Sequence, residues 1–582
     1  MRIAHAAIAL SVLTAAFPFA CGGTPQTLGF LPPGDAAASD AMAAADQAGD
    51  TPTFGDGATT TSGTCEAADG GTGGTAAGCE FFTAEPDSCT QALNSCFAAY
   101  VSNGGTTDVT ITLDFGGSPI KNFAHFARVP SGSGPAIKYG PLGGAGNVLH
   151  AGQVAILFLA GPSPSDTFAI RCPAGITPAF QGDAAQHGTG VGKAFHIQTD
   201  SLVTAYDIYP YGGGSSAYTA ASLLLPTSAW DTNYIAVDGY STFRPWISIV
   251  ALHDGTQVTI RPTADIVSVG GLSGATKGTT ATYSVNRGQV LQFTQDDELV
   301  GSPITSTYPI GLFGGVSCMN VPSDKEAWDT GHQQIPPVHA LGSEYVYTRY
   351  RDRYKGVPES PPVRIVGAVD GTILTYDPAA PSGAPPTIGA GQMVEFDAYD
   401  VFTVSSQDNL HPFYVAAYMT GASAYNPGSG TDDGRGDPEF VNVVPPAQFG
   451  KSYVLFTDPT YPETELVVVR QRGPSGFADV QLDCLGGNIA GWMEVGASGK
   501  YQYARVDLVT AGFMPQGNCD NGQHGMSSAL PFGVTVWGWG SSATGGDIDP
   551  NTGMGTPTYS QYVSYAYPGG TGVAAINPVV TQ

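Results

Sequence analysis

Charged side chains are scarce in this chain of 582 residues. Asp, Glu, Lys and Arg together make up 12% of it, about half of the share in an average soluble protein. Basic residues are the rarest, because 22 Lys and Arg stand against 49 Asp and Glu, for a formal net charge of −27. Such a chain repels phosphate groups, so we expect no binding to nucleic acid or to an anionic membrane surface.

Motifs for catalysis are also missing. The sequence has no G-x-S-x-G, H-E-x-x-H, Walker loop or Rossmann glycine pattern after a strand, and no two of its ten histidines are spaced i, i+2 or i, i+4. No spacing among the 49 acids singles out a glycosidase pair. His524 is expected to hydrogen-bond a turn next to Cys519 rather than to act in catalysis. The chain is therefore predicted not to be an enzyme.

Long apolar runs are absent beyond the N-terminus. The run from Ile3 to Ala20 follows one basic residue, Arg2, and ends before Cys21, which is typical of a secretory signal. The position of Cys21 resembles a bacterial lipoprotein signal and predicts that Cys21 is lipidated, for export to an outer membrane or cell surface. Pro18 and Phe19 depart from that motif, and the alternative is ordinary cleavage with secretion.

Residues 22–64 contain almost no large apolar side chains. Because such a segment cannot bury enough surface to offset its ordering entropy, it is predicted to be a disordered tether. The sequence has nine cysteines and no C-x-x-C pair, so zinc ribbons and thioredoxin-like chemistry are not expected. If Cys21 carries lipid, eight cysteines remain for up to four disulfides in an oxidising compartment.

From about residue 95 the chain consists of short β-branched and aromatic runs separated by Gly, Pro, Asp and Asn, which predicts an all-β head. Three kinds of segment recur. A Pro-containing entry precedes an aromatic strand at Pro226 to Tyr234, Pro336 to Tyr345 and Pro445 to Tyr453. An Asp-Gly turn and a Gly-Gln turn precede other strands, the first at Asp254-Gly255 and Asp370-Gly371, the second at Gly152-Gln153, Gly288-Gln289 and Gly391-Gln392.

These recurrences predict four quasi-repeats of about 110 residues. A unit of this size is typical of a β-sandwich, so tandem or fused sandwich-like units are expected, with a β-propeller-like ring as the alternative. The predicted divisions are a signal peptide at 1–20, the lipidated Cys and linker at 21–64, a Cys-rich entry and first repeat at 65–215, and further repeats at 216–330, 331–435 and 436–582, the last including a C-terminal tail.

In their order, these segments resemble the IgG Fc-binding protein N-terminal domain family. The resemblance covers about residues 65–570 and is carried by Gly78-Cys-Glu-Phe81, Cys96 to Asn103, Ala221 to Pro226, Phe313 to Cys318, Gln334 to Pro337, Pro531 to Gly538 and Ser564 to Gly570. It implies a bacterial surface lipoprotein whose head binds or adheres to an extracellular protein or glycan. The alternatives are a secreted carbohydrate-active hydrolase and a purely structural envelope protein.

One departure from the family concerns the disulfides. Where the family has a second Cys after Cys318, this chain has Trp328, and Thr330 and Gln333 replace the family's His and Glu. Cys318 is therefore expected to pair with a distant partner such as Cys172 or to stay reduced. Cys484 and Cys519 are expected to pair, and two bridges of open connectivity are expected among Cys65, Cys79, Cys89 and Cys96.

Two acidic loops offer oxygen ligands that suit a structural calcium ion. The first contains Asp432, Asp433 and Asp437, and the second contains Asp547, Asp549 and Asn551. The alternative for each loop is a solvated acidic turn. No other cofactor is expected.

Overall fold

The computed structural model describes residues 65, 76–90, 92–163, 169–212, 218–269, 271–325, 328–354, 356–424, 435–510, 512–540 and 562–581. Within these ranges the elements are β-strands and short 3-10 helices, which confirms the predicted all-β class. The 3-10 helices are η1 (Phe123–His125), η2 (Gly134–Ala136), η3 (Thr227–Ala229), η4 (Val338–Ala340), η5 (Ala422–Ala424), η6 (Pro446–Gln448) and η7 (Asp483–Leu485).

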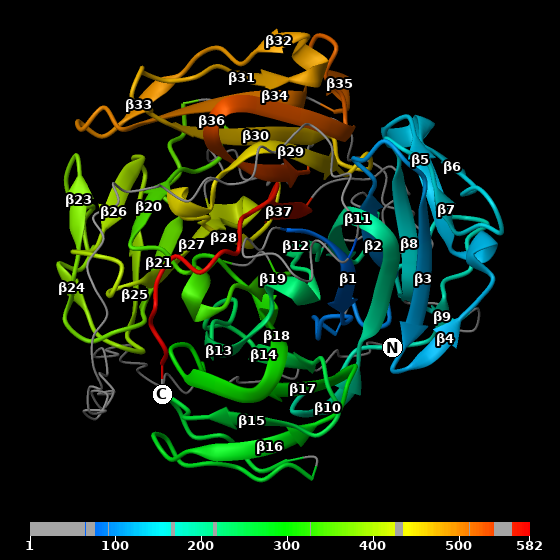
Figure 1. The fold of residues 1–582 in the computed structure, drawn as a ribbon, viewed down its shortest axis with the longest axis horizontal. Helices are drawn as coiled ribbons and strands as arrows, with labels where there is room; N and C mark the ends of the chain where they lie inside the picture. Colours follow the sequence, from blue (N-terminus) through cyan, green and yellow to red (C-terminus); the bar gives the residue numbers. More distant parts are fainter. Residues whose placement is uncertain are drawn as a thin grey trace, which may run out of the picture.

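The strands are grouped in sheets that surround a common centre (Figure 1). The first sheet contains β1 (Ala77–Thr83), β2 (Phe97–Ser102), β3 (Val109–Phe115), β4 (Ser118–Ile120), β5 (Ala127–Ser131), β6 (Lys138–Gly140), β7 (Val148–Leu149), β8 (Val154–Gly161), β9 (Phe180–Gln181), β11 (Phe195–Tyr209) and β12 (Ala220–Leu224). The second contains β10 (Gly190–Lys193), β13 (Asp231–Ile235), β14 (Pro245–Ala251), β15 (Thr256–Ile260), β16 (Ala281–Val285), β17 (Gln289–Thr294), β18 (Pro303–Met319) and β19 (Asp329–Ile335).

Three smaller sheets follow along the chain. They are built from β20 (Glu344–Tyr347), β23 (Thr375–Asp377) and β26 (Phe402–Ser405); from β21 (Pro362–Gly367), β25 (Met393–Asp397), β27 (Phe413–Met419) and β28 (Glu439–Asn442); and from β22 (Thr372–Ile373) and β24 (Thr387–Ile388). The last sheet contains β29 (Gly450–Thr457), β30 (Glu463–Gln471), β31 (Val480–Leu482), β32 (Gly487–Asn488), β33 (Met493–Val495), β34 (Tyr501–Thr510), β35 (Met514–Pro515), β36 (Gly522–Trp539) and β37 (Ser564–Pro568).

Four inner strands form the centre of the arrangement. β12, β19, β28 and β37 each pair with a strand of their own sheet, namely β11, β18, β27 and β36. They also contact one another in the closed order β12, β19, β28, β37 (Figure 1). The sheets are thus fused around one axis. This arrangement is closer to the ring that the sequence predicts as the alternative than to separate sandwiches in tandem. The number of repeats stays a prediction.

The recurrent Gly-Gln pairs form one kind of turn. The three glycines have φ of 73°, 70° and 68°, at Gly152, Gly288 and Gly391, in the left-handed region where glycine has no steric penalty. Each following glutamine folds its side chain back to accept the backbone N–H three residues earlier, over 3.3 Å for Gln153, 2.8 Å for Gln289 and 2.9 Å for Gln392. The recurrence therefore has a local structural cause.

The recurrent tyrosines also share one role. Each phenol accepts a hydrogen bond from the backbone N–H three residues earlier and donates one to a carbonyl of another strand or strand end. The three are Tyr234 with Asp231 and Ile310, Tyr345 with Gly342 and Phe413, and Tyr453 with Gly450 and Phe532. Each tyrosine thus ties the entry of a unit, just after η3, η4 or η6, to a neighbouring strand.

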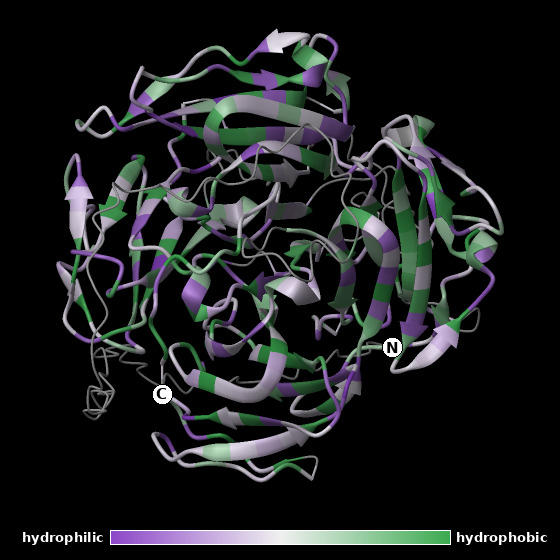
Figure 2. Ribbon diagram, in the orientation of Figure 1, coloured by the Kyte–Doolittle hydropathy of each residue, from purple (hydrophilic) through white to green (hydrophobic). Residues whose placement is uncertain are grey.

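The core crosses the borders between sheets. Hydrophobic and hydrophilic residues alternate along many strands (Figure 2), as expected when each strand buries one face. Tyr206 of β11 packs against Tyr567 of β37, with ring centroids 4.5 Å apart, and one hydrophobic cluster joins the first and last sheets. Among the described residues, no helix has the length and apolar character needed to cross a membrane.

Candidate binding site

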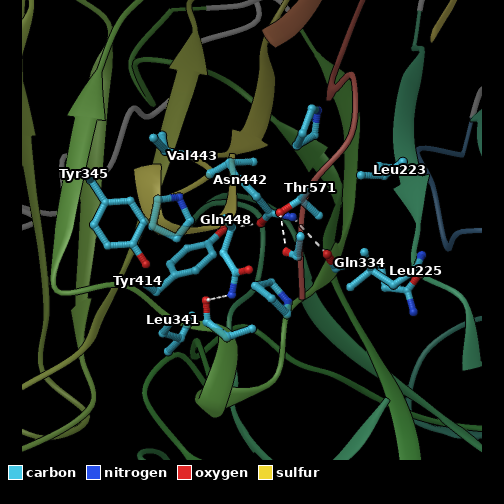
Figure 3. A pocket seen from close by; sticks show the side chains of 16 residues that line it. Leu223, Leu225, Gln334, Leu341, Tyr345, Tyr414, Asn442, Val443, Gln448 and Thr571 are labelled. Atoms are coloured by element: carbon cyan, nitrogen blue, oxygen red, sulfur yellow. Dashed lines mark hydrogen bonds between the residues drawn. The ribbon is translucent and has the colours of Figure 1, made fainter. Parts of the chain in front are cut away.

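One pocket lies at the axis, where the inner strands end (Figure 3). Its described lining includes Leu223, Gln334, Tyr414, Asn442 and Gln448, and contains no Asp, Glu, His, Lys or Arg. The cavity is about 30 Å³, roughly the share of one water molecule in the liquid. A sugar ring or a peptide side chain does not fit in this volume.

The polar groups of this pocket bind the protein itself. The side-chain amide oxygen of Gln334 accepts a hydrogen bond from the Leu225 N–H at 2.6 Å. The side-chain amide of Asn442 donates to the backbone carbonyl of Gln334 at 2.8 Å. Gln448 donates to Ala574 O at 2.8 Å. Because these amides link separate inner segments, we assign the central pocket a structural role.

The residues predicted to bind calcium are placed only in part. Asp432, Asp433, Asp547, Asp549 and Asn551 lie outside the described residues.

Asp437 is buried, and its carboxylate accepts the Ala422 N–H at 3.3 Å. Burial, together with the nearby carboxylates of Asp437 and Glu439, raises the pKa of Asp329 well above its ordinary value. Calcium binding stays a prediction.

The structure pairs all eight candidate cysteines, in the bridges Cys65–Cys79, Cys89–Cys318, Cys96–Cys172 and Cys484–Cys519. The expected Cys484–Cys519 bridge is present, and Cys318 has a distant partner as expected, although this partner is Cys89 and not Cys172. One expectation was wrong, because the four N-terminal cysteines form one internal bridge instead of two. The reason is the closed arrangement, which brings residues separated by 229 positions together beside the second sheet.

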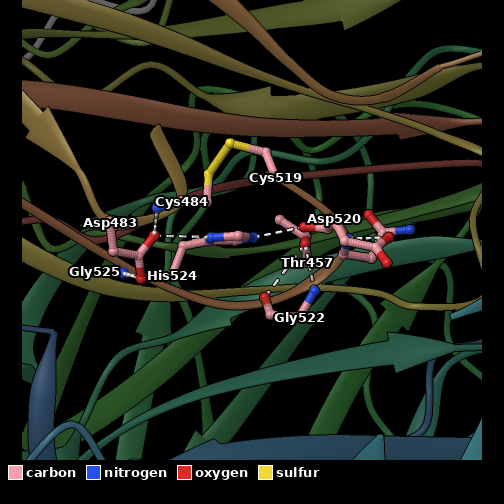
Figure 4. The surroundings of a disulfide bond; sticks show 9 residues. Thr457, Asp483, Cys484, Cys519, Asp520, Gly522, His524 and Gly525 are labelled. Carbon is pink, nitrogen blue, oxygen red and sulfur yellow. Dashed lines mark hydrogen bonds and ion pairs between the residues drawn. A yellow bond between two sulfur atoms is a disulfide. The ribbon is translucent and has the colours of Figure 1, made fainter. Parts of the chain in front are cut away.

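A group of metal-type side chains surrounds the Cys484–Cys519 bridge (Figure 4). Ligand atoms of Asp483, Cys484 and His524 lie within 4.8 Å of one another. The sulfur of Cys484 is bonded to Cys519, however, and a metal ligand must be a thiolate. This group is therefore not a metal centre.

His524 fixes the neighbouring turn. One ring nitrogen lies 3.1 Å from the Asp483 carboxylate and the other lies 2.8 Å from the Asp520 carbonyl, next to Cys519. Burial alone would raise the pKa of Asp483, but the hydrogen bond with His524 holds it below its ordinary value. This is the structural role that the sequence predicts for His524.

A larger hollow lies beside the Cys89–Cys318 bridge, near the beginning of β12 and β19. Its volume is about 280 Å³, close to the lower limit of about 300 Å³ for small-molecule sites. Phe243 is 57% exposed, and its ring lies over that of Trp328 with centroids 4.1 Å apart. Arg244 is half exposed, and its guanidinium lies 3.3 Å from the buried Asp87.

The backbone at this hollow is held in a costly conformation. Phe243 and Arg244 have φ of 42° and 65°, where a non-glycine residue costs about 1–3 kcal/mol. The Cys318 N–H donates to Phe243 O at 3.3 Å, and the Ser317 N–H donates to Arg244 O at 3.1 Å. The second sheet therefore fixes the direction of both side chains.

Sequence reasoning did not identify Phe243 and Arg244. The available signal was an aromatic residue beside one of the few basic residues, just before Pro245 and a strand. Trp328 was noted only as the replacement of a cysteine. Nothing in the linear sequence places it beside Phe243.

Comparison with known proteins gives one family. The family described as "IgGFc binding protein" matches residues 220–538, more than half of the chain. The human "IgGFc-binding protein" is 24% identical over 297 residues, which is 50% of this chain and 5% of that relative. No solved structure matches. The family match includes Phe243, Arg244 and Trp328, and because it covers more than half of the chain, the chain belongs to the IgGFc binding protein family.

Proposed function

We propose that this chain is a non-enzymatic extracellular protein that binds another extracellular protein, and that a lipid on Cys21 holds it at the cell surface. The family match over residues 220–538 carries this proposal. The name of the human relative says that it binds the Fc part of IgG. Since that relative is matched over only 5% of its length, Fc is the first partner to test for this chain.

The geometry of the described sites fits binding better than catalysis. The described residues that line the central pocket are uncharged, and their amide groups form hydrogen bonds within the protein. Among the described residues that line the hollow, Arg244 is the charged side chain and none is a carboxylate. A hydrolase needs an acid and a base or nucleophile at one site, so neither described site supports that alternative.

Binding to the Fc fragment is the first expected result. The purified full chain, immobilised on a sensor, should retain Fc and should not retain the Fab fragment of the same antibody, which serves as the control for nonspecific adsorption. Because the chain carries a charge of −27, the measurement belongs at physiological salt, where long-range attraction is screened beyond about 8 Å. Host-surface and matrix fractions would be passed over the same sensor. Equal retention of the Fc and Fab fragments would contradict the proposal. So would the absence of any retained protein from Fc and from these fractions.

The anchor can be tested separately with the C21S variant. If the Cys21 sulfur carries the lipid, the wild-type chain should sediment with membranes in detergent-free extracts and the variant should move to the soluble fraction. Stable membrane anchoring needs at least two acyl signals. Because the C21S variant lacks the thiol that would carry a lipid, sedimentation with membranes is expected to be abolished. Continued sedimentation of the variant would show that another feature holds the chain at the membrane.

A further inference from the structure

The hollow beside the Cys89–Cys318 bridge has a composition that points to a ligand class. Its described lining consists of aromatic rings, hydroxyl groups, the disulfide and one guanidinium, from Ser88, Cys89, Thr90, Tyr218, Phe243, Arg244, Ser317, Cys318 and Trp328. None of these side chains is aliphatic. A lining of aromatic rings with a few polar groups and one charged group is typical of a site for a small polar ligand.

The two facing rings form one wall. Phe243 is the most exposed of the large hydrophobic aromatic residues in the described part of the chain, and its ring packs against that of Trp328 at an interplanar angle of 51°. Aromatic faces carry partial negative charge, so they attract the slightly positive C–H groups on the flat side of a sugar ring. The left-handed backbone at residues 243 and 244 presents this wall rigidly, which lowers the entropy lost on binding.

Arg244 supplies a charge beside that wall. A guanidinium has five N–H donors, and within the described structure Arg244 uses one of them, on Asp87 at 3.3 Å. Asp87 is also held by His187 at 2.9 Å and by the Gly188 N–H at 3.1 Å. The side chain of Arg244 is 49% exposed, so its outer edge faces solvent and matches the two oxygens of a carboxylate.

We propose that this hollow binds a carboxylate-bearing sugar residue of a glycan, a uronic or a sialic acid, with its ring against Phe243 and Trp328 and its carboxylate on Arg244. The inference rests on the proposed binding function and deepens it, because it makes the partner a glycosylated one. A volume of about 280 Å³ suits one sugar residue with its substituents rather than a length of extended peptide.

The test uses free sugars and the full chain. Saturation-transfer NMR and calorimetry would compare glucuronic acid with glucose, its neutral counterpart, and would measure N-acetylneuraminic acid in a second arm. We expect one or both acids to bind, and glucose to bind about tenfold more weakly or worse, as the loss of a charged hydrogen bond predicts. The arm that binds identifies the source of the carboxylate.

Variants assign the binding to the hollow. R244Q should remove the preference for the acid over glucose, and F243A should weaken binding of both sugars about tenfold. Y308A is the matched control, since Tyr308 is 48% exposed on β18, packs against His253 and is not part of the hollow lining. Thermal unfolding of each variant would show that it is folded before its affinity is compared.

Three results would overturn the inference. They are equal binding of glucuronic acid and glucose, unchanged binding in both R244Q and F243A, and tighter binding of an acetylated glutamate peptide than of either acidic sugar. Retention of Fc or of an extracellular partner by R244Q, together with no sugar binding by the wild type, would refute this inference and leave the proposed function standing. Sugar binding without any protein partner would refute the proposed function alone.

Discussion

Replacing Arg364 with Met is expected to lower the free energy of unfolding by about 3–5 kcal/mol, because it removes a buried cation and leaves the buried Asp238 carboxyl, together with the less buried Glu298 and Glu395, without it. Arg364 lies on β21, and its side chain is 3% exposed. Its guanidinium lies 2.8 Å from Glu395 of β25, 2.6 Å from Glu298 and 3.8 Å from Asp238.

This arginine joins two sheets. Asp238 and Glu298 lie in segments that connect strands of the second sheet. Strands β21 and β25 belong to the sheet that also contains β27 and β28. The guanidinium also lies over the rings of Tyr240 and Tyr418, 4.7 Å and 5.7 Å from their centroids. Its removal therefore affects the border on which the closed arrangement depends.

Urea unfolding followed by tryptophan fluorescence would measure the loss, with R287M as the control. Arg287 is 41% exposed and lies 2.6 Å from Glu80, and exposed ion pairs contribute about 0–1 kcal/mol. If R364M and R287M lower stability by the same amount, the buried cation does not hold the two sheets together.

The local part of this fold could be predicted from the sequence because its causes are local. A turn with a glycine of positive φ, followed by a glutamine whose side chain accepts the N–H three residues earlier, needs only four consecutive residues, and it recurs at Gly152, Gly288 and Gly391. The same holds for tyrosines that bind the N–H three residues earlier. Local contacts that recur in the structure therefore appear as recurrent short motifs in the sequence.

The inner strands and the hollow could not be predicted in this way. β19 spans residues on both sides of the predicted division at 330/331 and pairs with β18, and its contacts with β12 and β28 join segments about a hundred residues apart. Phe243 meets Trp328 because β14 and β19 both pair with β18, and Cys89, which lies between β1 and β2 of the first sheet, meets Cys318 of β18 because the first two sheets pack together. Both contacts depend on long-range strand pairing and packing, which no local pattern encodes.

Stability is expected to fall as the pH rises from about 5 to 8, and the E85Q variant is expected to lose much of this dependence. Glu85 is 3% exposed. Burial, and then the charge of Asp183, raises its pKa to about 8, against the hydrogen bond from the Ala184 N–H at 2.9 Å. His187 and Tyr209 also face it and act in the opposite direction to burial.

The sign follows from proton binding. Between the ordinary glutamate pKa of 4.5 and the folded value of about 8, the folded state holds a proton on Glu85 that the unfolded state has released. The free energy of unfolding therefore decreases with rising pH in this window. Each unit of pKa difference corresponds to about 1.4 kcal/mol, which gives a loss of about 3–5 kcal/mol by pH 8 from this group. Glu465, whose pKa burial raises to about 7, adds to the loss.

Unfolding in urea at pH 5, 6, 7 and 8 would measure the dependence for the wild type, for E85Q and for E494Q, in which an exposed glutamate is replaced. E494Q should follow the wild type, since it changes the net charge equally without touching a buried acid. His187 has its pKa raised to about 10 by hydrogen bonds to Asp183 and Asp87, and its stabilisation, fully present below pH 6.5, decreases as the pH rises from 6.5 to 10. A residual slope in E85Q therefore reports Glu465, His187 and other buried acids with raised pKa values, such as Asp329 and Glu439, and a slope identical to that of the wild type would mean that Glu85 is ionised in the folded chain at neutral pH.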